Sequence, residues 1–220
     1  MPEVSAIVLA GGKSRRLGID KALLKLNDER LLTRILDTLC TLSDDLLVVT
    51  DDKVELTHLG VRIVPDIHPG LGPLGGIYSG LLAMRYERGL VVGCDMPFLN
   101  VHLLRHMILL SQDFDVVIPR IQANTEPLHA LYNKACLGAI EDSFSRGRRR
   151  IVSFFSQVRV RYVEAGETDA FDPEHWSWFN INTPAELELA CKWAKKGGHS
   201  IFGSGNRVPR ADGCKAGYVA

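Results

Sequence analysis

The chain has 220 residues, of which 46% are hydrophobic, and its formal net charge at pH 7 is zero. This length and apolar content suffice for one packed domain. The balanced charge provides no overall field that would favour nucleic acid or an acidic membrane surface, so any anion site must be local. Five scattered cysteines without metal-ligand spacing argue against a disulfide framework and a structural zinc, and they fit a reducing cytoplasm.

Neither a signal peptide nor a run of roughly 20 apolar residues is present in the sequence, so we expect a soluble cytoplasmic protein that makes no membrane contact. In the first 120 residues short apolar strands alternate with segments of helical periodicity. The pattern predicts, in chain order, strand 4–10, helix 31–42, strands 45–50 and 61–65, helix 77–89, a strand from 90 to 95, helix 103–110 and strand 115–119. This alternation predicts an α/β fold of three layers, a largely parallel sheet with helices on both faces.

The second half is less regular. "EPLHALYN" predicts a strand followed by a helix from Lys134, the basic run 146–150 opens a further helix, and "RVRYVEA" is a late strand. The last helix is the clearest, because Thr183 suits the N-cap, Pro184 the first helical position and Glu186 the third. Residues after 197 are rich in glycine and polar side chains. We therefore expect one domain over 1–196 and a flexible tail over 197–220.

The loop after the first strand, "GGKSRRLGIDK", is the strongest candidate for an anion site. Gly11 and Gly12 allow backbone amides to converge on phosphate oxygens, and the cations Lys13, Arg15, Arg16 and Lys21 add charge. Ligands of open α/β sheets bind at the carboxyl ends of the strands, where this loop lies. The loop fits neither a Walker A motif nor GxGxxG. It predicts a polyphosphate site, with a merely solvated basic loop as the alternative.

A second glycine-rich stretch contains Gly70, Gly72 and Gly75 in the spacing GxGxxG, and Asp95 lies near the interval expected of a ribose-binding acid. A protein that binds a dinucleotide such as NAD is therefore an alternative. Against it, the motif follows the third strand rather than the first, and Pro73 stiffens the turn. We regard the glycine spacing as weak evidence.

Polar residues end several predicted strands. Asp95 suits Mg²⁺ opposite a phosphate loop, or caps the helix that follows Phe98. Asp66 suits a hydrogen bond to a base edge or a ribose. In the alternative interpretation its side chain begins the loop turn. Asn180 and Asn182 alternate on one predicted strand and so face one side, where they orient a polar substrate or metal-bound water; capping of the next helix is the alternative for Asn182.

The basic run 148–150 stands at a predicted helix start, where the macrodipole favours anions rather than cations. An anionic partner would relieve this conflict, and a solvated helix start is the alternative interpretation. The histidines and Ser14 lack the spacing of a metal site, a triad or a nucleophile elbow. The sequence therefore gives no sign of a covalent nucleophile.

Four stretches in order, "LAGGKSRRLGIDKALL", "GPLGGIYSGL", "CDMPF" and "NINTPAEL", resemble the molybdenum cofactor guanylyltransferase family over residues 4–195. The resemblance implies a Rossmann-like nucleotidyltransferase fold whose N-terminal half binds GTP with Mg²⁺ and whose C-terminal half binds molybdenum-molybdopterin. It implies transfer of GMP to the terminal phosphate of that acceptor with release of pyrophosphate, transient contact with other molybdenum cofactor proteins, and no nucleic acid partner. A cytidylyl- or sugar-phosphate nucleotidyltransferase of the same fold is the alternative.

The resemblance also assigns residues. Asp95 would ligate Mg²⁺ and act in catalysis with Lys21 and Arg16, and Asp66 would help to recognise guanine. The other nucleotide contacts it implies are Leu9, Ala10, Gly11, Gly12, Thr50, Gly72, Pro73, Leu74 and Gly76. The molybdopterin side would include Arg149, Arg150, Asn180 and Asn182. Two positions depart from the family pattern: Thr50 stands where some relatives have Asn, and Glu126 where relatives often have His.

Overall fold

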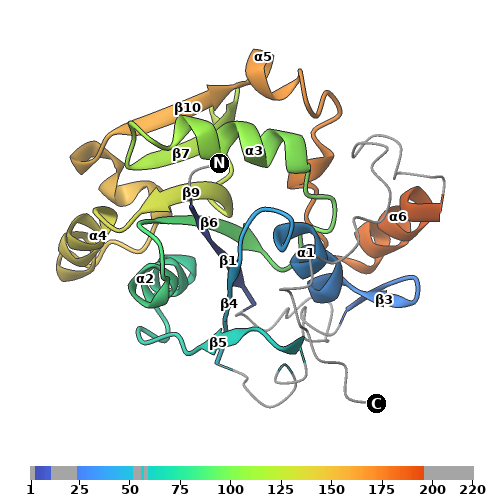
Figure 1. Ribbon diagram of the computed structural model, residues 1–220, viewed down its shortest axis with the longest axis horizontal. Coiled ribbons are helices and arrows are strands. Elements are labelled where there is room, and N and C mark those ends of the chain that lie inside the picture. The colour runs from blue at the N-terminus through green and yellow to red at the C-terminus, as the bar shows by residue number, and fades with distance from the viewer. Residues whose placement is uncertain (1–2, 11–23, 52–55, 57–58, 196–220) are drawn as a thin grey trace.

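The computed structural model describes residues 3–10, 24–51, 56 and 59–195, which form a sheet between two layers of helices (Figure 1). The strands are β1 Ser5–Leu9, β2 Lys25–Leu26, β3 Glu29–Arg30, β4 Asp45–Val49, β5 Arg62–Val64, β6 Arg88–Gly93, β7 Val116–Ile121, β8 Asn124–Thr125, β9 His129–Asn133 and β10 Val160–Glu164. The helices are α1 Leu31–Leu39, α2 Pro73–Ala83, α3 Val101–Leu110, α4 Cys136–Ser145, α5 Ala165–Thr168 and α6 Pro184–Lys195, with the 3₁₀ helices η3 Ile151–Gln157 and η4 Trp176–Trp178.

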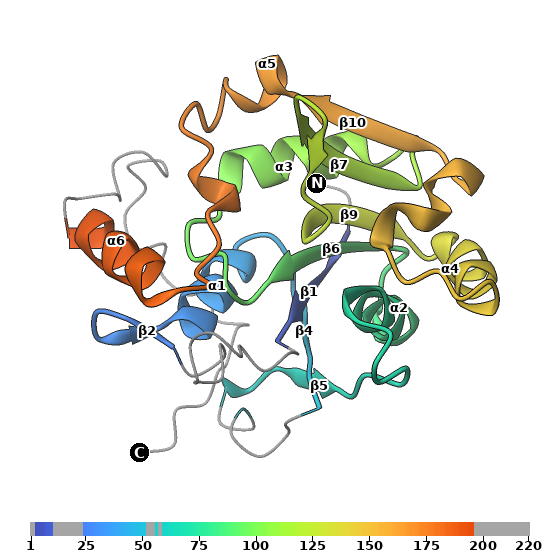
Figure 2. The same ribbon diagram turned by 180° about the vertical axis from the view of Figure 1, so that it is seen from behind.

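The main sheet has the strand order β10-β7-β9-β6-β1-β4-β5, with β8 paired to β7. The pairs β6/β1, β1/β4, β4/β5 and β7/β10 are parallel, whereas β9 runs antiparallel to both β6 and β7. Helices α1 and α3 pack on one face and α2 and α4 on the other, as the two opposite views show (Figures 1 and 2). The predicted fold class, a mixed and mainly parallel sheet covered on both faces, is confirmed.

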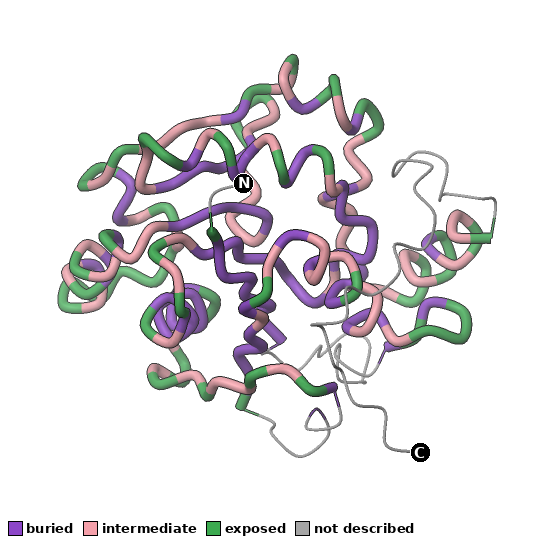
Figure 3. Tube along the Cα trace, in the orientation of Figure 1, coloured by how far each residue is buried: buried purple, intermediate pink, exposed green. Residues whose placement is uncertain are grey.

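The centre of the sheet is buried on both faces (Figure 3). Every residue of β1 is buried; Ala6 and Val8 belong to the core under α1 and α3, and Ile7 and Leu9 to the core under α2 and α4. A strand covered on both faces requires an uninterrupted apolar run. Burial of each large aliphatic side chain stabilises the fold by about 1.5–3 kcal/mol, so this run suits β1 to its place inside the sheet, between β6 and β4.

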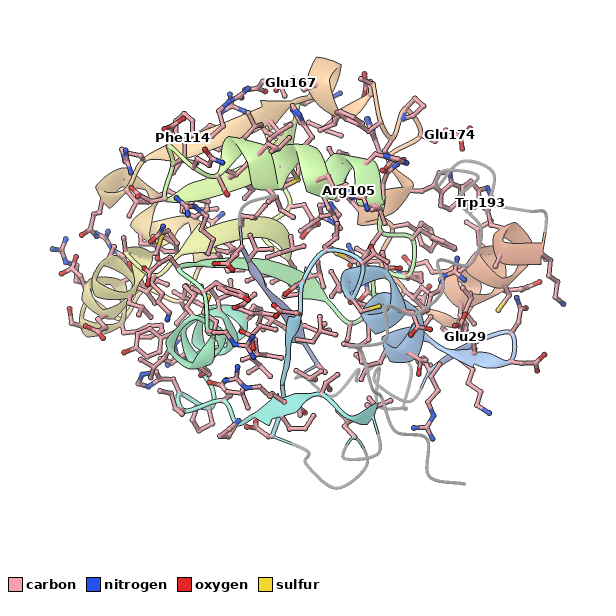
Figure 4. The ribbon with its side chains drawn as sticks, in the orientation of Figure 1. Glu29, Arg105, Phe114, Glu167, Glu174 and Trp193 are labelled. Carbon is pink, nitrogen blue, oxygen red and sulfur yellow. The ribbon has the colours of Figure 1, made fainter. Side chains whose placement is uncertain are left out.

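A third apolar cluster joins α6 to the β2–β3 hairpin. Trp193 of α6, labelled in Figure 4, stacks on Trp176 with 3.6 Å between the ring centroids, and Phe98 packs edge-on against both rings. The expected cap of α6 is confirmed: the Glu186 amide donates to Thr183 Oγ1, and the Thr183 amide donates to Glu186 Oε2 at 2.8 Å. The cluster and the cap anchor the connection from η4 to α6 beside the sheet.

Helix α2 differs from the predicted helix 77–89. It begins at Pro73, after Gly72 with φ of 69°, and ends at Ala83, because Met84 is extended. Gly89 belongs to β6 and is not a helix terminus. A Cβ atom on Gly89 would lie 2.8 Å from Ile7 Cδ1, so this glycine permits close packing of β6 and β1, a contact distant in sequence.

Three further boundaries were predicted wrongly. Residues 179–182 are not a strand; they form an extended connection in which the Ile181 amide donates to the Asp95 carbonyl at 3.0 Å. Helix α1 ends at Leu39 rather than at residue 42. The run 146–150 ends α4 through Gly147, whose φ is 67°, and it precedes a 3₁₀ helix. The connection 179–182 is held by a hydrogen bond to a segment distant in sequence, whereas α1 and α4 end on local bonds, from the Cys40 amide to the Leu36 carbonyl and from the Gly147 amide to the Phe144 carbonyl.

The predicted tail 197–220 lies outside the described residues. Within the part of the chain that the structure describes, no helix is long and apolar enough to span a bilayer. Among the described residues, Cys40, Cys94, Cys136 and Cys191 are not joined in disulfides.

A buried carboxylate ties together the amino-terminal edge of the sheet. Asp45, at the start of β4, is 1% exposed and accepts hydrogen bonds from Ser5 Oγ at 2.5 Å, the Arg85 amide at 2.8 Å and Arg62 Nη1 at 2.5 Å. Burial raises the pKa of Asp45, but these donors and the Arg62 charge outweigh burial, so the pKa lies below its ordinary value of 3.8.

We expect Asp45→Asn to lower the free energy of unfolding at pH 7 by about 1.5–3 kcal/mol, because a neutral amide with N–H groups of its own replaces a buried carboxylate that accepts three hydrogen bonds. The folded-state pKa is depressed, so the stabilisation by Asp45 is complete above the unfolded pKa of about 3.9 and is lost as pH falls through the folded value. Urea unfolding from pH 7 to 2.5 should show the two proteins converging below about pH 4. Asp44→Asn, at a carboxylate that is 70% exposed, is the control and should change stability little.

Candidate active site

The candidate site lies at the carboxyl edge of the sheet, where β1, β4 and β6 end side by side. Leu9 pairs with Val49 on one side and with Gly93 on the other. Beyond these pairs, the Ala10 amide donates to the Val49 carbonyl at 2.9 Å and the Cys94 amide to the Leu9 carbonyl at 3.1 Å. The parallel register therefore places the residues that follow the three strands next to one another.

The loop predicted to bind polyphosphate leaves the sheet at this edge, directly after Ala10. Gly11, Gly12, Arg16 and Lys21 lie outside the described residues, so their assignment stays a prediction. At Ala10 the amide is already bonded to β4, which leaves its carbonyl as the backbone group that could meet a nucleotide. Thr50, which is 3% exposed, follows β4, and its amide donates to the Val64 carbonyl of β5 at 3.0 Å.

Asp66 organises the loop between β5 and α2. Its Oδ1 accepts hydrogen bonds from the His68 amide at 2.9 Å and from Ser79 Oγ at 3.0 Å, and Ser79 Oγ in turn accepts from the Ile67 amide. The interpretation in which Asp66 begins the loop turn with its side chain is confirmed. Its role in guanine recognition stays a prediction, and the remaining carboxylate oxygen, Oδ2, is the atom that could serve it.

The glycines of the second glycine-rich stretch have packing roles. A Cβ atom on Gly75 would lie 2.9 Å from the His68 carbonyl and 3.3 Å from both Asp66 carboxylate oxygens, and Gly72 requires a positive φ of 69°. Gly76 lies against the Leu9 side chain. Positive φ at Gly70 and Gly72 and close packing at Gly75 thus account for the GxGxxG spacing. The contact of Gly76 with Leu9 brings the amino terminus of α2, which favours anions, to the end of β1.

The arginine run 148–150 lies beside the glycine-rich loop between β5 and α2. Arg149 Nη1 donates to the Gly70 carbonyl at 3.4 Å, and the His68 ring packs against Tyr78 and Phe144 with 5.1 Å between centroids in each case. Arg150 precedes η3 and is exposed. The prediction that both arginines bind the acceptor is untested. Arg149 nevertheless places a cation at the glycine-rich loop. The two residues of this contact are 79 positions apart in the sequence, so no local pattern reveals it.

Asp95 follows β6, and its carboxylate folds back over Gly93, because a Cβ atom on Gly93 would lie 2.7 Å from Asp95 Oδ1. The alternative role as a helix cap is wrong. Asn100 caps α3, with its side chain accepting from the amides of His102 and Leu103. Asp95 is half-buried at the edge of the sheet, as a metal ligand facing a phosphate would be.

Glu126 is a second carboxylate near Asp95 that sequence reasoning noted only as a departure from a family pattern. Burial raises the pKa of Glu126, and the nearby Asp95 charge raises it further, while hydrogen bonds from the Leu128 amide and the Asn180 side chain oppose the shift. The connection from β8 to the antiparallel β9 carries Glu126 to the end of β6. Its proximity to Asp95 is thus a product of sheet topology.

Asn180 and Asn182 flank the buried Ile181 on the extended segment, so their side chains leave the backbone on the side away from that residue. Asn180 Nδ2 donates to the Trp178 carbonyl at 3.0 Å. Thr183 and Glu186 form the cap of α6, and the Asn182 amide donates to Glu186 Oε2 at 2.8 Å. Because the Ile181 amide donates to the Asp95 carbonyl at 3.0 Å, this segment runs beside the residue that ends β6.

This donor set suits Mg²⁺ bound together with a nucleotide. Among the described residues, no three His, Cys, Asp or Glu side chains form a metal cage, and Mg²⁺ needs only one or two carboxylates besides phosphate oxygens and water. Asp95 supplies such a carboxylate at a strand end. Carboxylate oxygens near β6, and helix amides with Arg149 near α2, fit a metal-bound phosphate chain.

Comparison with known proteins identifies relatives of this chain. A family model described as a MobA-like NTP transferase domain matches residues 6–161. The chain is 36% identical over 190 residues to a probable molybdenum cofactor guanylyltransferase of Pelotomaculum thermopropionicum, covering 86% of this chain and 93% of that one. It is 34% identical over 192 residues to the molybdenum cofactor guanylyltransferase of Desulfosudis oleivorans, covering 86% and 95%.

Among solved structures, the molybdopterin-guanine dinucleotide biosynthesis protein A of Archaeoglobus fulgidus superposes with a TM-score of 0.76 at 28% identity, covering 87% of this chain and 99% of that one. A 2-C-methyl-D-erythritol 4-phosphate cytidylyltransferase of Thermus thermophilus shares the fold, with a TM-score of 0.64 at 18% identity, covering 88% and 99%.

We expect Gly93→Ala to displace the Asp95 carboxylate, because the new Cβ would lie 2.7 Å from Oδ1. Disturbing the surroundings of a metal ligand typically lowers metal affinity roughly 10–100-fold. Mn²⁺ binding in the presence of GTP, followed by electron paramagnetic resonance, measures the effect. Gly138→Ala in α4, where a Cβ meets nothing within 4 Å, is the matched control. Equal Mn²⁺ affinity in the two variants would contradict the metal assignment of Asp95.

Proposed function

This chain belongs to the MobA-like NTP transferase family, and we propose that it is a molybdenum cofactor guanylyltransferase. It transfers GMP from GTP to the terminal phosphate of molybdenum-molybdopterin and releases pyrophosphate. Relatives of that name, 31–36% identical over most of the chain, support the proposal. The observation that carries it is the position of Asp95, which stands beside the end of β1 at the edge where the basic loop begins.

In the proposed reaction, an oxygen of the acceptor phosphate attacks the α-phosphorus of GTP as pyrophosphate departs, without a covalent enzyme intermediate. Asp95 would hold Mg²⁺, which when bound neutralises charge on the phosphates and on the leaving group. Lys21 and Arg16 would clamp the triphosphate, and the amino terminus of α2 would face it. Positioning and charge neutralisation suffice for such a transfer, so no protein nucleophile is needed.

The acceptor has to approach a triphosphate although both are anions. Arg149 is held at the Gly70 carbonyl, where a cation reduces repulsion between the two phosphate groups, and Arg150 follows it. Asn180 and Asn182 would bind neutral parts of the acceptor near Asp95. A cytoplasmic location and transient contacts with other molybdenum cofactor proteins belong to the same proposal.

Asp95→Asn should lower the rate of pyrophosphate release from GTP and molybdenum-loaded molybdopterin by roughly 10²–10³-fold, because it removes the charge that holds the metal. The rate is measured with an enzyme-coupled pyrophosphate assay at saturating Mg²⁺. Asp113→Asn, at an exposed carboxylate on the opposite edge of the sheet, should behave as the unaltered protein does. A variant at Asp95 with nearly full turnover would remove this residue from the mechanism.

Nucleotide specificity is tested by thermal unfolding with GTP, CTP, UTP or NAD, each with Mg²⁺. A ligand at 100 times its dissociation constant stabilises the folded state by about 2.7 kcal/mol, which corresponds to roughly 5–10 °C for a domain of this size. We expect that shift with GTP and a smaller one with the others. Stabilisation by CTP alone would favour a cytidylyltransferase, and stabilisation by NAD alone would favour a dinucleotide-binding protein.

A further inference from the structure

We propose that Ser79 is a positioning residue for base selection: its hydroxyl fixes the plane of the Asp66 carboxylate, so that Asp66 Oδ2 meets the N–H donors of a base. The class of base selected in this way carries two adjacent donors, as the N1–H and 2-amino edge of guanine does. The assignment of Asp66 to the base rests on the proposed function. The way in which Ser79 holds Asp66 rests on contacts within this chain.

The hydrogen bonds at Asp66 decide which of its oxygens a ligand can use. Oδ1 accepts from the His68 amide at 2.9 Å and from Ser79 Oγ at 3.0 Å. Each oxygen of an ionised carboxylate has two lone-pair sites and donates nothing, so these two donors fill Oδ1. Oδ2 accepts no hydrogen bond from the residues that the structure describes. Asp66 therefore offers one oxygen, with two acceptor sites, to the donors of a ligand.

The single hydrogen of the Ser79 hydroxyl goes to Asp66. Ser79 is 2% exposed, and its Oγ accepts from the Ile67 amide at 3.0 Å. Two acceptors lie within reach of its hydrogen, Asp66 Oδ1 at 3.0 Å and the Gly75 carbonyl at 2.9 Å. The Gly75 carbonyl already accepts within the helix, four residues before Ser79, and a hydrogen bond to a charged oxygen is roughly twice as strong as a neutral one. The hydroxyl therefore donates to the carboxylate.

Side-chain packing alone does not fix the plane of this carboxylate. The terminal torsion of an aspartate has only a broad preference, and the residue beside the carboxylate is Gly75, where a Cβ atom would lie 3.3 Å from each oxygen. Two donors from different elements define the plane, the His68 amide from the loop and Ser79 Oγ from the buried face of α2. Without the hydroxyl, the carboxylate can turn about its one remaining hydrogen bond.

The first turn of α2 relates Asp66 to the phosphate end of the site. Gly75 faces the Asp66 carboxylate, and the next residue, Gly76, faces Leu9 at the end of β1, where a Cβ atom would lie 3.4 Å from Leu9 Cδ2. The basic loop begins one residue after Ala10, which follows β1. A nucleotide bound by that loop and the amino terminus of α2 therefore has its base within the reach of Asp66. A carboxylate there repels phosphate and attracts N–H groups.

The positioning can be tested without any nucleotide, by hydrogen exchange of the His68 amide. This amide bonds to Asp66 Oδ1 and not to Ser79, so its protection reports the orientation of the carboxylate. Ser79→Ala should remove most of that protection, and Ser79→Thr, which keeps the hydroxyl, should retain it. Ser143→Ala is the matched control, because Ser143 is a helical serine that is 1% exposed and whose Oγ has no partner among the described residues. Unchanged His68 exchange in Ser79→Ala would overturn the positioning role.

Base selection is measured by calorimetric titration with GTP and with ITP, each with Mg²⁺. ITP lacks the 2-amino group and so has one donor fewer for Oδ2. Ser79→Ala should raise the Kd for GTP about tenfold, a typical loss for one hydrogen bond to a charged group, and the Kd for ITP less, so that the preference for GTP falls. Ser79→Thr and Ser143→Ala should keep the preference. Asp66→Ala/Ser79→Ala should match Asp66→Ala alone, because Ser79 acts through Asp66; this comparison decides the matter if Ser79→Thr fails to fold.

The outcomes separate the two proposals. If the unaltered protein binds CTP or UTP as well as GTP, the proposed guanylyl transfer is wrong, and the His68 exchange still decides whether Ser79 holds Asp66. If the unaltered protein prefers GTP but Ser79→Ala weakens GTP and ITP equally, Ser79 has a merely structural role and the further inference is wrong. A loss of affinity for GTP that is absent with 2′-deoxyGTP would assign Asp66 to the ribose and also contradict it.

Discussion

The site depends on the parallel register of β1 with its two neighbours. Because Leu9 pairs with both Val49 and Gly93, three chain segments that are distant in sequence leave the sheet at one edge. Parallel strands place the residues that follow them on the same side, and apolar packing on both faces of β1 keeps the register from slipping. Without this alignment the basic loop after Ala10 would not begin beside Asp95.

Around that edge, two glycines leave room for two carboxylate side chains. Gly75 gives room for the turn that Asp66 holds, and Gly93 gives room for the Asp95 carboxylate. A residue with a side chain at either position would push the functional group away from the edge. The antiparallel β9 adds a different element, because its connection from β8 brings Glu126 towards Asp95. Burial, together with the charge of Asp95, raises the pKa of Glu126, and shifted pKa values are typical of functional sites.

The same edge has two ends of opposite character. Near β5 and α2, helix amides and Arg149 favour anions, whereas at the end of β6 and in the connection to β9 the carboxylates of Asp95 and Glu126 favour cations. A nucleotidyl transfer between two phosphates requires positive charge where the phosphates meet and neutral contacts for the rest of the acceptor. The separation of these groups therefore supports an arrangement in which phosphate groups lie towards β5 and α2 and the neutral part of the acceptor lies towards β6 and β9.

From the sequence alone one can establish the features that depend on neighbours along the chain. The apolar run of β1, the alternation of strands and helices and the Thr183–Glu186 cap each follow from local patterning, and the structure confirms them. Asp95 and Asp66 were recognised as strand-end carboxylates for the same reason. By contrast, the limits of α2, the packing role of Gly89, the contact of Arg149 with Gly70 and the approach of Glu126 to Asp95 and Asn180 required the folded chain. These features arise from contacts between segments far apart in sequence, and local periodicity carries no information about which segments will meet.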